Sequence, residues 1–129
     1  MVTCTLKTRK RQEVVDITLQ IQEHVSKMPP ETRAVLVFVP HTTAALAINE
    51  NADPSVRADF LQKMSRSFPE QDGYAHAEGN SDAHIKAILT GSSVLLIVEE
   101  GRLQLGTWQG VYFCEFDGPR NRNFWIQPL

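Results

Sequence analysis

The feature of this sequence that most constrains its fold is the run Ala34–Val39, which is wholly apolar, contains three valines and is followed by Pro40. Branched apolar residues favour extended backbone, and a run without polar alternation is typical of a strand buried on both faces. Proline lacks the N–H that a sheet requires, so the strand is expected to end at Pro40. Other elements of the chain must therefore cover this strand.

Further strands are predicted where short apolar or alternating segments lie between turn residues. These segments are Cys4–Thr8, Glu13–Ile17, Ala44–Ile48, Val94–Val98, Leu103–Leu105, Val111–Phe116 and Asn123–Gln127. Turns are expected at Glu100-Gly101 and at Gly118-Pro119.

A first helix is expected from Thr18 to Met28, because Leu19, Ile21 and Val25 offer apolar positions and Pro29-Pro30 stops it. A second helix follows Asp53, which can cap it, and Pro54, which suits the first helical position. Apolar residues recur every four positions in this second helix and predict a face toward the core. They are Val56, Phe60, Met64 and Phe68.

A third helix is predicted to begin near Ser81 or Asp82 and to end at Thr90, with Gly91 as a left-handed cap. Its core-facing residues are expected to be Ile85, Ile88 and Leu89. Strands dominate both ends of the sequence and helices lie between them. We therefore predict an α+β fold, a single compact domain over residues 1–129 with a mainly antiparallel sheet covered by two or three helices.

Composition excludes several classes of protein. With 42% hydrophobic residues the chain can bury a core without disulfides, and its net charge of −2 provides no basic surface for nucleic acid. No apolar run approaches the roughly 20 residues that span a bilayer, and no charged start leads into an apolar stretch. Cys4 and Cys114 are far apart in sequence and predict buried thiols in a reducing compartment, so we expect a cytoplasmic protein.

Three of the four histidines lie where a predicted element begins or ends, or in a polar loop. His41 directly follows the buried strand, His76 lies in the loop, and His84 lies in the first turn of the third helix. Imidazole is a common zinc ligand, and three ligands with an open position make a catalytic type of metal site. The spacing is not a metal signature in itself, so surface or capping histidines remain the alternative.

Two other polar groups are candidates for chemistry. Glu50 follows a strand without a structural task, so it is a candidate general base or supporting carboxylate, with Asn49 and Asp53 beside it. The string Gly106–Gly110 predicts either a hairpin turn or a backbone close to a ligand, with Thr107 and Gln109 as hydrogen-bonding groups. Near the end of the chain, Arg120 and Arg122 could hold a phosphate or carboxylate, or be solvated.

Five strings, in this order and at this spacing, resemble the YjbQ-like family over nearly the whole chain. They are His41-Thr42-Thr43, Asn49–Pro54, Glu78-Gly79-Asn80 with Ala83–Lys86, Gly91-Ser92-Ser93, and Gly101–Leu103 with Gly106–Gly110. The resemblance implies a small α+β fold that assembles as a homotrimer. It also implies a divalent metal, most simply zinc, held by His41, His76 and His84.

The resemblance further implies a metal-dependent enzyme of the secondary thiamine-phosphate synthase type, which joins a pyrimidine diphosphate to a thiazole phosphate as a weak side activity. The expected catalytic residues are His41, Glu50 and Gln109. The expected substrate-binding or supporting residues are Asn49, Asp53, Thr107, Glu115 and Arg120. The metal would neutralise the leaving diphosphate, and magnesium could serve with a phosphorylated substrate.

Two alternatives remain open on the residues. The protein could be a non-catalytic trimer that binds a metal or a metabolite, or its histidines could only bridge subunits. A polar site is unlike the centre of a subunit interface, which is usually apolar. The enzyme and the non-catalytic binding protein are therefore favoured over histidines that only bridge subunits. An open metal position would indicate an enzyme and a closed one a structural site.

Overall fold

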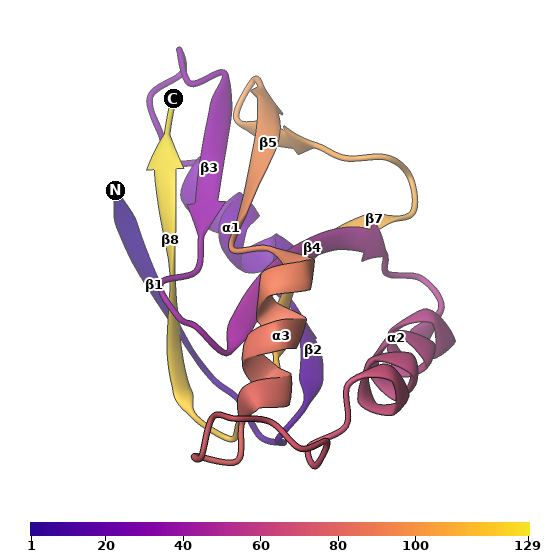
Figure 1. The fold of residues 1–129 in the computed structure, drawn as a ribbon. Coiled ribbons are helices and arrows are strands. Elements are labelled where there is room, and N and C mark those ends of the chain that lie inside the picture. The colour runs from indigo at the N-terminus through magenta and orange to yellow at the C-terminus, as the bar shows by residue number, and fades with distance from the viewer.

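The computed structural model describes residues 1–129 and places the apolar run at the centre of a sheet, as strand β3 (Ala34–Phe38). β3 pairs antiparallel with β5 (Ser93–Glu99) on one side and with β8 (Asn121–Pro128) on the other. β1 (Val2–Lys7) lies beside β8, and β6 (Arg102–Gln104) lies beside β5. The result is a five-stranded sheet of order β1-β8-β3-β5-β6 (Figure 1).

A second sheet has three strands. β7 (Gln109–Glu115) lies between β2 (Glu13–Asp16) and β4 (Ala44–Glu50), and both pairings are antiparallel. Each strand predicted from the sequence is present, as are the turns at Glu100-Gly101 and Gly118-Pro119. The predicted antiparallel α+β fold is confirmed, with its strands divided between two sheets.

The main core lies between the two sheets. The five-stranded sheet contributes Val35, Val37 and Phe124, and β7 contributes Phe113 from the other side. Helix α1 (Thr18–Val25) is shorter than predicted and packs Ile21 and Val25 into the same core. All of these side chains are buried, as the apolar content of the sequence requires.

The prediction that β3 is buried on both faces is wrong for a single chain. Val35 and Val37 point into the core, whereas Phe38 on the opposite face is exposed. On the neighbouring strand β5, Leu95 and Ile97 of the same outer face are 64% and 60% exposed. The outer face of the five-stranded sheet is therefore apolar and exposed to solvent. An apolar run in the sequence does not distinguish such an exposed face from a buried one.

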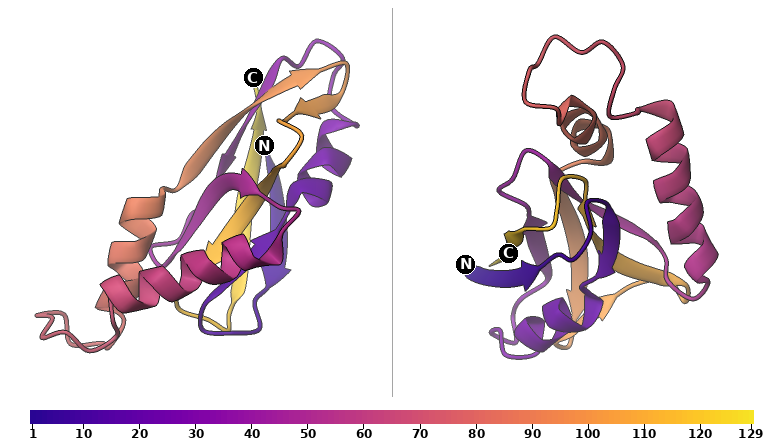
Figure 2. Two further views of the ribbon diagram at one scale, coloured as in Figure 1. Left: turned by 90° about the vertical axis from the view of Figure 1, so that its right-hand side faces the viewer. Right: turned by 90° about the horizontal axis from the view of Figure 1, so that it is seen from below.

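Helices α2 (Pro54–Ser67) and α3 (Ser81–Thr90) lie together beside the three-stranded sheet, away from α1 (Figure 2). Behind β4 and β7 they form a second, smaller apolar cluster. Its buried members are Ala45, Ala83, Ala87, Tyr112, Cys114 and Phe116. None of the three helices has the length and apolar character to cross a bilayer.

The predicted core face of α3 is wrong. Ile88 and Leu89 are 78% and 62% exposed, and the helix instead buries Ala83 and Ala87 with the charged pair Asp82 and Lys86. Small residues let the helix approach the sheet closely, so the alanine face wins over the larger isoleucine and leucine side chains. Gly91 ends the helix with a positive φ of 106°, as predicted, although its ψ of 155° is extended and not left-handed helical.

Helix α2 begins as predicted, with the Asp53 carboxylate accepting the Ser55 N–H at 2.9 Å and Pro54 in the first turn. Its apolar stripe does not enter the core, because no residue of α2 is buried. Figure 1 shows the helix standing apart from the two sheets. The predicted inward face is confirmed in part: Phe60 and Met64 pack against the second apolar cluster, with the Phe60 and Phe116 ring centroids 6.4 Å apart, whereas Val56 is exposed. Val56, Phe60 and Met64 also border a cavity that is described below.

A buried ionic cluster fastens α3 to the loop after β1. The Lys86 ammonium lies 2.7 Å from Asp82 Oδ2, and both side chains are fully buried. Arg11 donates two further hydrogen bonds to the same carboxylate, at 3.0 and 3.1 Å. Burial alone would raise the pKa of Asp82, but the bonds from Arg11 and Lys86 outweigh it and hold the pKa below its usual value.

Replacing Asp82 by alanine is expected to lower the free energy of unfolding by about 3–5 kcal/mol, because it leaves the Lys86 ammonium buried without its carboxylate. Urea unfolding at pH 7 measures the change. Asp59→Ala, an exposed position on α2, is the control and should be nearly neutral. Equal stability of the two variants would contradict this role for Asp82.

Candidate functional site

His41 follows Pro40 at the end of β3, and the backbone fixes its ring. Nε2 accepts a hydrogen bond from the Asn123 N–H of β8 at 2.9 Å. In the neutral ring the proton is therefore on Nδ1. Burial, followed by the nearby Arg122 charge, lowers the pKa of His41. At neutral pH His41 is thus an uncharged imidazole whose free nitrogen is a hydrogen-bond donor.

Two adjoining pockets of about 320 Å³ each share His41, Thr42 and His84. We call one the polar lobe, because no hydrophobic residue lines it, and the other the mixed lobe. The polar lobe is completed by Pro40, Thr43, Glu78, Asn80, Asp117, Arg120 and Arg122. The mixed lobe is completed by Ala44, Ala87, Ile88, Gly91 and Ser92. Together they form a two-lobed cleft at the start of α3.

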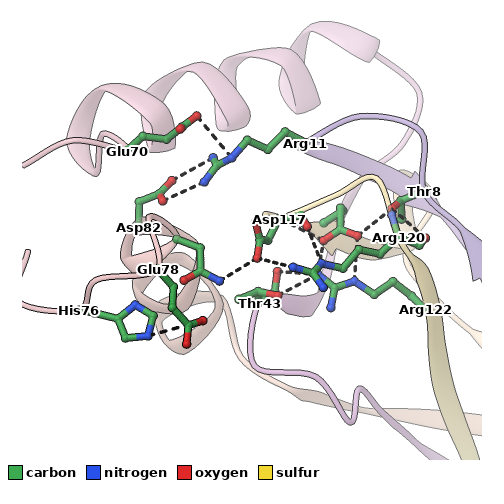
Figure 3. Close-up of polar contacts among 12 residues, drawn as sticks. Thr8, Arg11, Thr43, Glu70, His76, Glu78, Asp82, Asp117, Arg120 and Arg122 are labelled. Atoms are coloured by element: carbon green, nitrogen blue, oxygen red, sulfur yellow. Dashed lines mark hydrogen bonds and ion pairs between the residues drawn. The ribbon is translucent and has the colours of Figure 1, made fainter.

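Asp117 organises one wall of the polar lobe. Its Oδ2 accepts from Asn80 Nδ2 at 2.9 Å and from Arg120 Nη2 at 3.0 Å. Arg120 also donates from Nε to the Asp117 carbonyl at 2.8 Å, and the two side chains lie together in Figure 3. Asn80 Oδ1 is buried and has no hydrogen-bond partner. The wall therefore offers a guanidinium held in place and an unused acceptor.

Beneath the polar lobe lies a buried ion pair between Glu115 and Arg122. Glu115 accepts from Arg122 through both carboxylate oxygens, with the Nε contact at 2.8 Å, and from the Thr8 hydroxyl at 2.7 Å. Arg122 Nη2 also donates to the Thr43 hydroxyl at 2.9 Å (Figure 3). Glu115 is fully buried and lines neither lobe, so its place in the structure is that of a support.

The three histidines do not fit a metal centre as one chain places them. His76 lies outside both lobes, and its ring meets that of His84 edge to face at a centroid distance of 5.3 Å. His41 already uses Nε2 on Asn123. No three His, Cys, Asp or Glu side chains of the chain are arranged to hold a metal ion. A zinc site on these residues stays a prediction that the geometry of a single chain does not support.

The second predicted group lies at the other end of β4. Glu50 is the last residue of that strand and pairs with Gln109 on β7, whereas His41 precedes the first residue, Ala44. At about 3.4 Å per residue, the seven residues of β4 extend roughly 20 Å. Glu50 and Gln109 therefore cannot act with His41 on one substrate within a single chain.

Glu50 has a local structural role, as do Asn49 and Asp53. Glu50 Oε2 accepts the Asp53 N–H at 3.2 Å, and Asn49 Oδ1 accepts the Glu50 N–H at 2.7 Å. Asp53 caps α2, and its bonds from Ser55 lower the pKa of its carboxyl group. These three residues fix the backbone at the N-terminus of α2.

The glycine-rich string forms a tight turn that connects β6 of the five-stranded sheet to β7 of the three-stranded sheet, so it is not a hairpin. Gln109 Oε1 accepts the Gly106 N–H at 2.8 Å, and the Gln109 N–H returns to the Gly106 carbonyl at 3.0 Å. Thr107 is exposed between them. Gly110 has no room for a side chain, because the Asn51 side chain lies against it. The predicted tight turn is therefore present, but the predicted hairpin is wrong because the two flanking strands belong to different sheets.

Comparisons with known proteins agree with this fold over its full length. A model of the family described as UPF0047 protein YjbQ-like matches residues 2–129. The UPF0047 protein YugU of Bacillus subtilis is 48% identical over 128 residues, which cover 98% of this chain and 97% of YugU. A UPF0047 protein of Archaeoglobus fulgidus is 46% identical over 127 residues, covering 97% of this chain and 98% of that protein.

Solved structures give the same result. A crystal structure of a yjbq/upf0047-family protein from Clostridium acetobutylicum has a TM-score of 0.97 and 46% identity, and 100% of both chains is covered. The conserved hypothetical protein TT1486 from Thermus thermophilus has a TM-score of 0.93 and 42% identity, again with 100% of both chains covered. This chain belongs to the YjbQ-like family. Membership establishes the fold but not a reaction.

In this YjbQ-like chain the cleft contains one residue that sequence reasoning did not single out, Asp117. An acidic residue between a buried strand and the Gly118-Pro119 turn was the available signal. Asn80, Thr42 and Thr43 had been noted only as parts of the family strings. The buried thiols were predicted correctly, since Cys4 and Cys114 are free and buried, and burial raises the pKa of Cys114 to about 12.

Glu115 is expected to make the stability of the protein depend on acid. Burial would raise its pKa, but the bonds from Arg122, Thr8 and the Asp117 N–H outweigh it and hold the pKa below its usual value. A group with a lowered folded pKa stabilises the fold above its unfolded pKa, about 4.3, and this is lost as the pH falls through the folded pKa.

Glu115→Gln should therefore lower the free energy of unfolding by roughly 3 kcal/mol at pH 7 and flatten the decline of stability below about pH 4.3. Urea unfolding at a series of pH values measures both effects. Glu23→Gln, at an exposed position on α1, is the control. An unchanged acid profile in Glu115→Gln would show that the pair does not carry this dependence.

Proposed function

We propose that this protein binds a small phosphorylated or otherwise anionic metabolite in the two-lobed cleft and acts on it as an enzyme. The observation that carries the proposal is the polar lobe itself, which has no hydrophobic lining and presents the neutral His41 donor near the Arg120 guanidinium. Charge-assisted bonds from arginine and neutral N–H donors are the usual means of holding phosphate oxygens.

His41 suits this role because its tautomer is fixed. The Asn123 N–H occupies Nε2, so Nδ1–H is left to donate to an anionic ligand. The lowered pKa of His41 keeps its ring neutral at pH 7. A neutral donor needs no counter-ion while the cleft holds no ligand. Arg120 is oriented by its bonds to Asp117 and is half exposed at the rim, where a substrate can reach it.

The reaction class that we propose is a transfer that joins two small molecules, resembling thiamine-phosphate synthase. The two lobes meet at His41, Thr42 and His84, and one is polar whereas the other includes Ala87 and Ile88. A diphosphate leaving group would lie in the polar lobe, where His41 and Arg120 can stabilise the charge that develops on it. A less polar ring would lie in the mixed lobe.

A non-catalytic metabolite-binding protein is the alternative function. Glu50 and Gln109 lie at the far end of β4. Of the two carboxylates that line the polar lobe, Asp117 is paired with Arg120, which leaves Glu78 as the one available proton acceptor. Binding without turnover of a pyrimidine diphosphate and a thiazole phosphate would favour this alternative.

The divalent metal also remains a prediction. Zinc is implied by the resemblance, and magnesium could accompany a phosphorylated substrate, but our scheme uses only groups of the chain. A cytoplasmic location is proposed on the two free, buried cysteines, which agree with a reducing compartment. We expect no nucleic acid or membrane partner.

The cleft should bind inorganic pyrophosphate after the protein has been treated with a chelator. His41→Ala and Arg120→Gln should each weaken binding by about tenfold, because each removes a donor to the anion. Isothermal titration calorimetry gives the affinities, and elemental analysis of the same samples gives the metal content. Arg102→Gln, an exposed arginine on β6 outside the cleft, is the matched control.

Equal affinities in all four proteins would contradict the proposed cleft. Binding that appears only after zinc or magnesium is added would support the predicted metal instead of direct recognition by His41 and Arg120. Folding of each variant is checked by circular dichroism.

We also propose that the protein is a homotrimer, the number three being implied by the family resemblance. The support is the open outer face of the five-stranded sheet, on which Leu36 pairs with Leu95 and Phe38 stacks on Trp125 at a centroid distance of 5.6 Å. Contiguous exposed apolar side chains of this kind usually mark an interface.

Leu95→Arg should dissociate this oligomer, because it places a charge in the middle of the apolar face. Sedimentation equilibrium at micromolar concentration measures the mass. Leu19→Arg, which changes an exposed apolar residue on α1 away from that face, should leave the mass unchanged. A monomeric wild-type protein, or a trimeric Leu95→Arg variant, would contradict the proposed interface.

A further inference from the structure

A second cavity, separate from the cleft, lies between helix α2 and the three-stranded sheet. Its volume is about 410 Å³, which is within the range of small-molecule sites. Nine of its thirteen lining residues are hydrophobic, so it differs in chemistry from the polar lobe. It shares no lining residue with either lobe of the cleft. It is thus an independent candidate site.

The walls of this cavity come from two apolar surfaces, helix α2 and the three-stranded sheet, which are in contact where Phe60 and Met64 pack against the second apolar cluster. Helix α2 contributes Val56, Phe60 and Met64, which form the stripe that the sequence marked for the core. The sheet contributes Ala47 of β4 and Tyr112 of β7, which are cross-strand partners. Because α2 buries none of its residues, an apolar ligand between these walls would remove from water the surface that the fold leaves uncovered.

The lining of the cavity contains one cation, Arg57, and one carboxylate, Glu50, and the two do not form an ion pair. The Arg57 guanidinium lies over the Tyr112 ring, 5.4 Å from its centroid, and no carboxylate is within ion-pairing distance. Arg57 Nε is buried and makes no hydrogen bond. The charge of the guanidinium is therefore not compensated by the protein, and an anionic group in the cavity would pair with its terminal nitrogens.

We infer that this cavity binds a small molecule with a flat aromatic body and a single carboxylate. The body fits between the α2 stripe and the sheet, and the carboxylate accepts from Arg57. Aromatic and apolar walls with one oriented charged group are the usual composition of such a site. Tyr112 and Phe60 supply ring faces and edges for the aromatic body.

A second copy of the chain is a poorer occupant. The cavity is a concave space between a helix and a sheet, and an unpartnered donor lies inside it. The flat apolar face on the other sheet, around Leu95 and Ile97, is the surface suited to another copy. The two surfaces are on different sheets, so the inference does not depend on the proposed trimer or on the proposed reaction.

The test compares the affinities of the full-length protein for 2-naphthoate and for its neutral analogue 2-naphthamide. Calorimetry and ligand-observed NMR measure the binding. Wild type should bind 2-naphthoate about tenfold more tightly than 2-naphthamide. Arg57→Gln should remove this preference while it still binds the amide. Ala47→Phe should abolish binding of both, because the new ring fills the cavity between β4 and α2.

Arg66→Gln is the matched control, since it removes an arginine from the last turn of the same helix outside the cavity. It should keep the wild-type preference. No binding of 2-naphthoate by the wild type at millimolar concentration would overturn the inference, and so would equal affinities of Arg57→Gln and Arg66→Gln. If Ala47→Phe does not fold by circular dichroism, the arginine pair decides alone. Pyrophosphate affinity should be unchanged in Arg57→Gln, which separates this site from the cleft.

Discussion

The cleft depends on the buried ion pair between Arg122 and Glu115. Arg122 belongs to β8 of the five-stranded sheet and Glu115 to β7 of the three-stranded sheet, so the pair joins the two sheets where β7 ends and β8 begins. Thr8 after β1 and Thr43 before β4 bond to the same pair. Removing two charges from water costs several kcal/mol each, and only a fully bonded pair can offset this. Its bonds hold the strand ends in the positions that form the cleft.

The two ends of β4 serve different purposes as a result. At the Ala44 end the buried ion pair, His41 and the start of α3 create the polar lobe. At the Glu50 end, polar side chains close the turn between β6 and β7 and hold the start of α2. The residue strings that resemble the family include residues at both ends of β4, and the sequence therefore predicted a single site. A strand of about 20 Å separates them, so the strings serve at least two local structures in a single chain.

Local chemistry was predictable and long-range partners were not. The strands, the Asp53 cap and the Gly91 helix end follow from short-range rules, and each is present. The predicted face of α3 was wrong and the stripe of α2 is only partly covered, because periodicity identifies an apolar stripe but not what covers it. Lys86 reads as a solvated charge until Asp82 and Arg11 are brought together, and Arg11 is 71 residues away from Asp82. His41 likewise changes from a possible metal ligand to a donor only when Asn123 reaches its Nε2.

Hydrogen-bond satisfaction gives a common argument for both proposed sites. Among the buried side-chain nitrogen and oxygen atoms of the chain, only Asn80 Oδ1 and Arg57 Nε lack a partner. Native proteins pair such atoms almost without exception, so each unpaired one requires an explanation. Asn80 lines the polar lobe and Arg57 lines the cavity under α2. The two atoms differ in kind: Arg57 Nε is a donor, on a side chain that suits a carboxylate, whereas Asn80 Oδ1 is an acceptor and would pair with an N–H or O–H of a ligand and not with its phosphate oxygens. Ligands would complete the hydrogen bonding that the fold itself leaves unfinished.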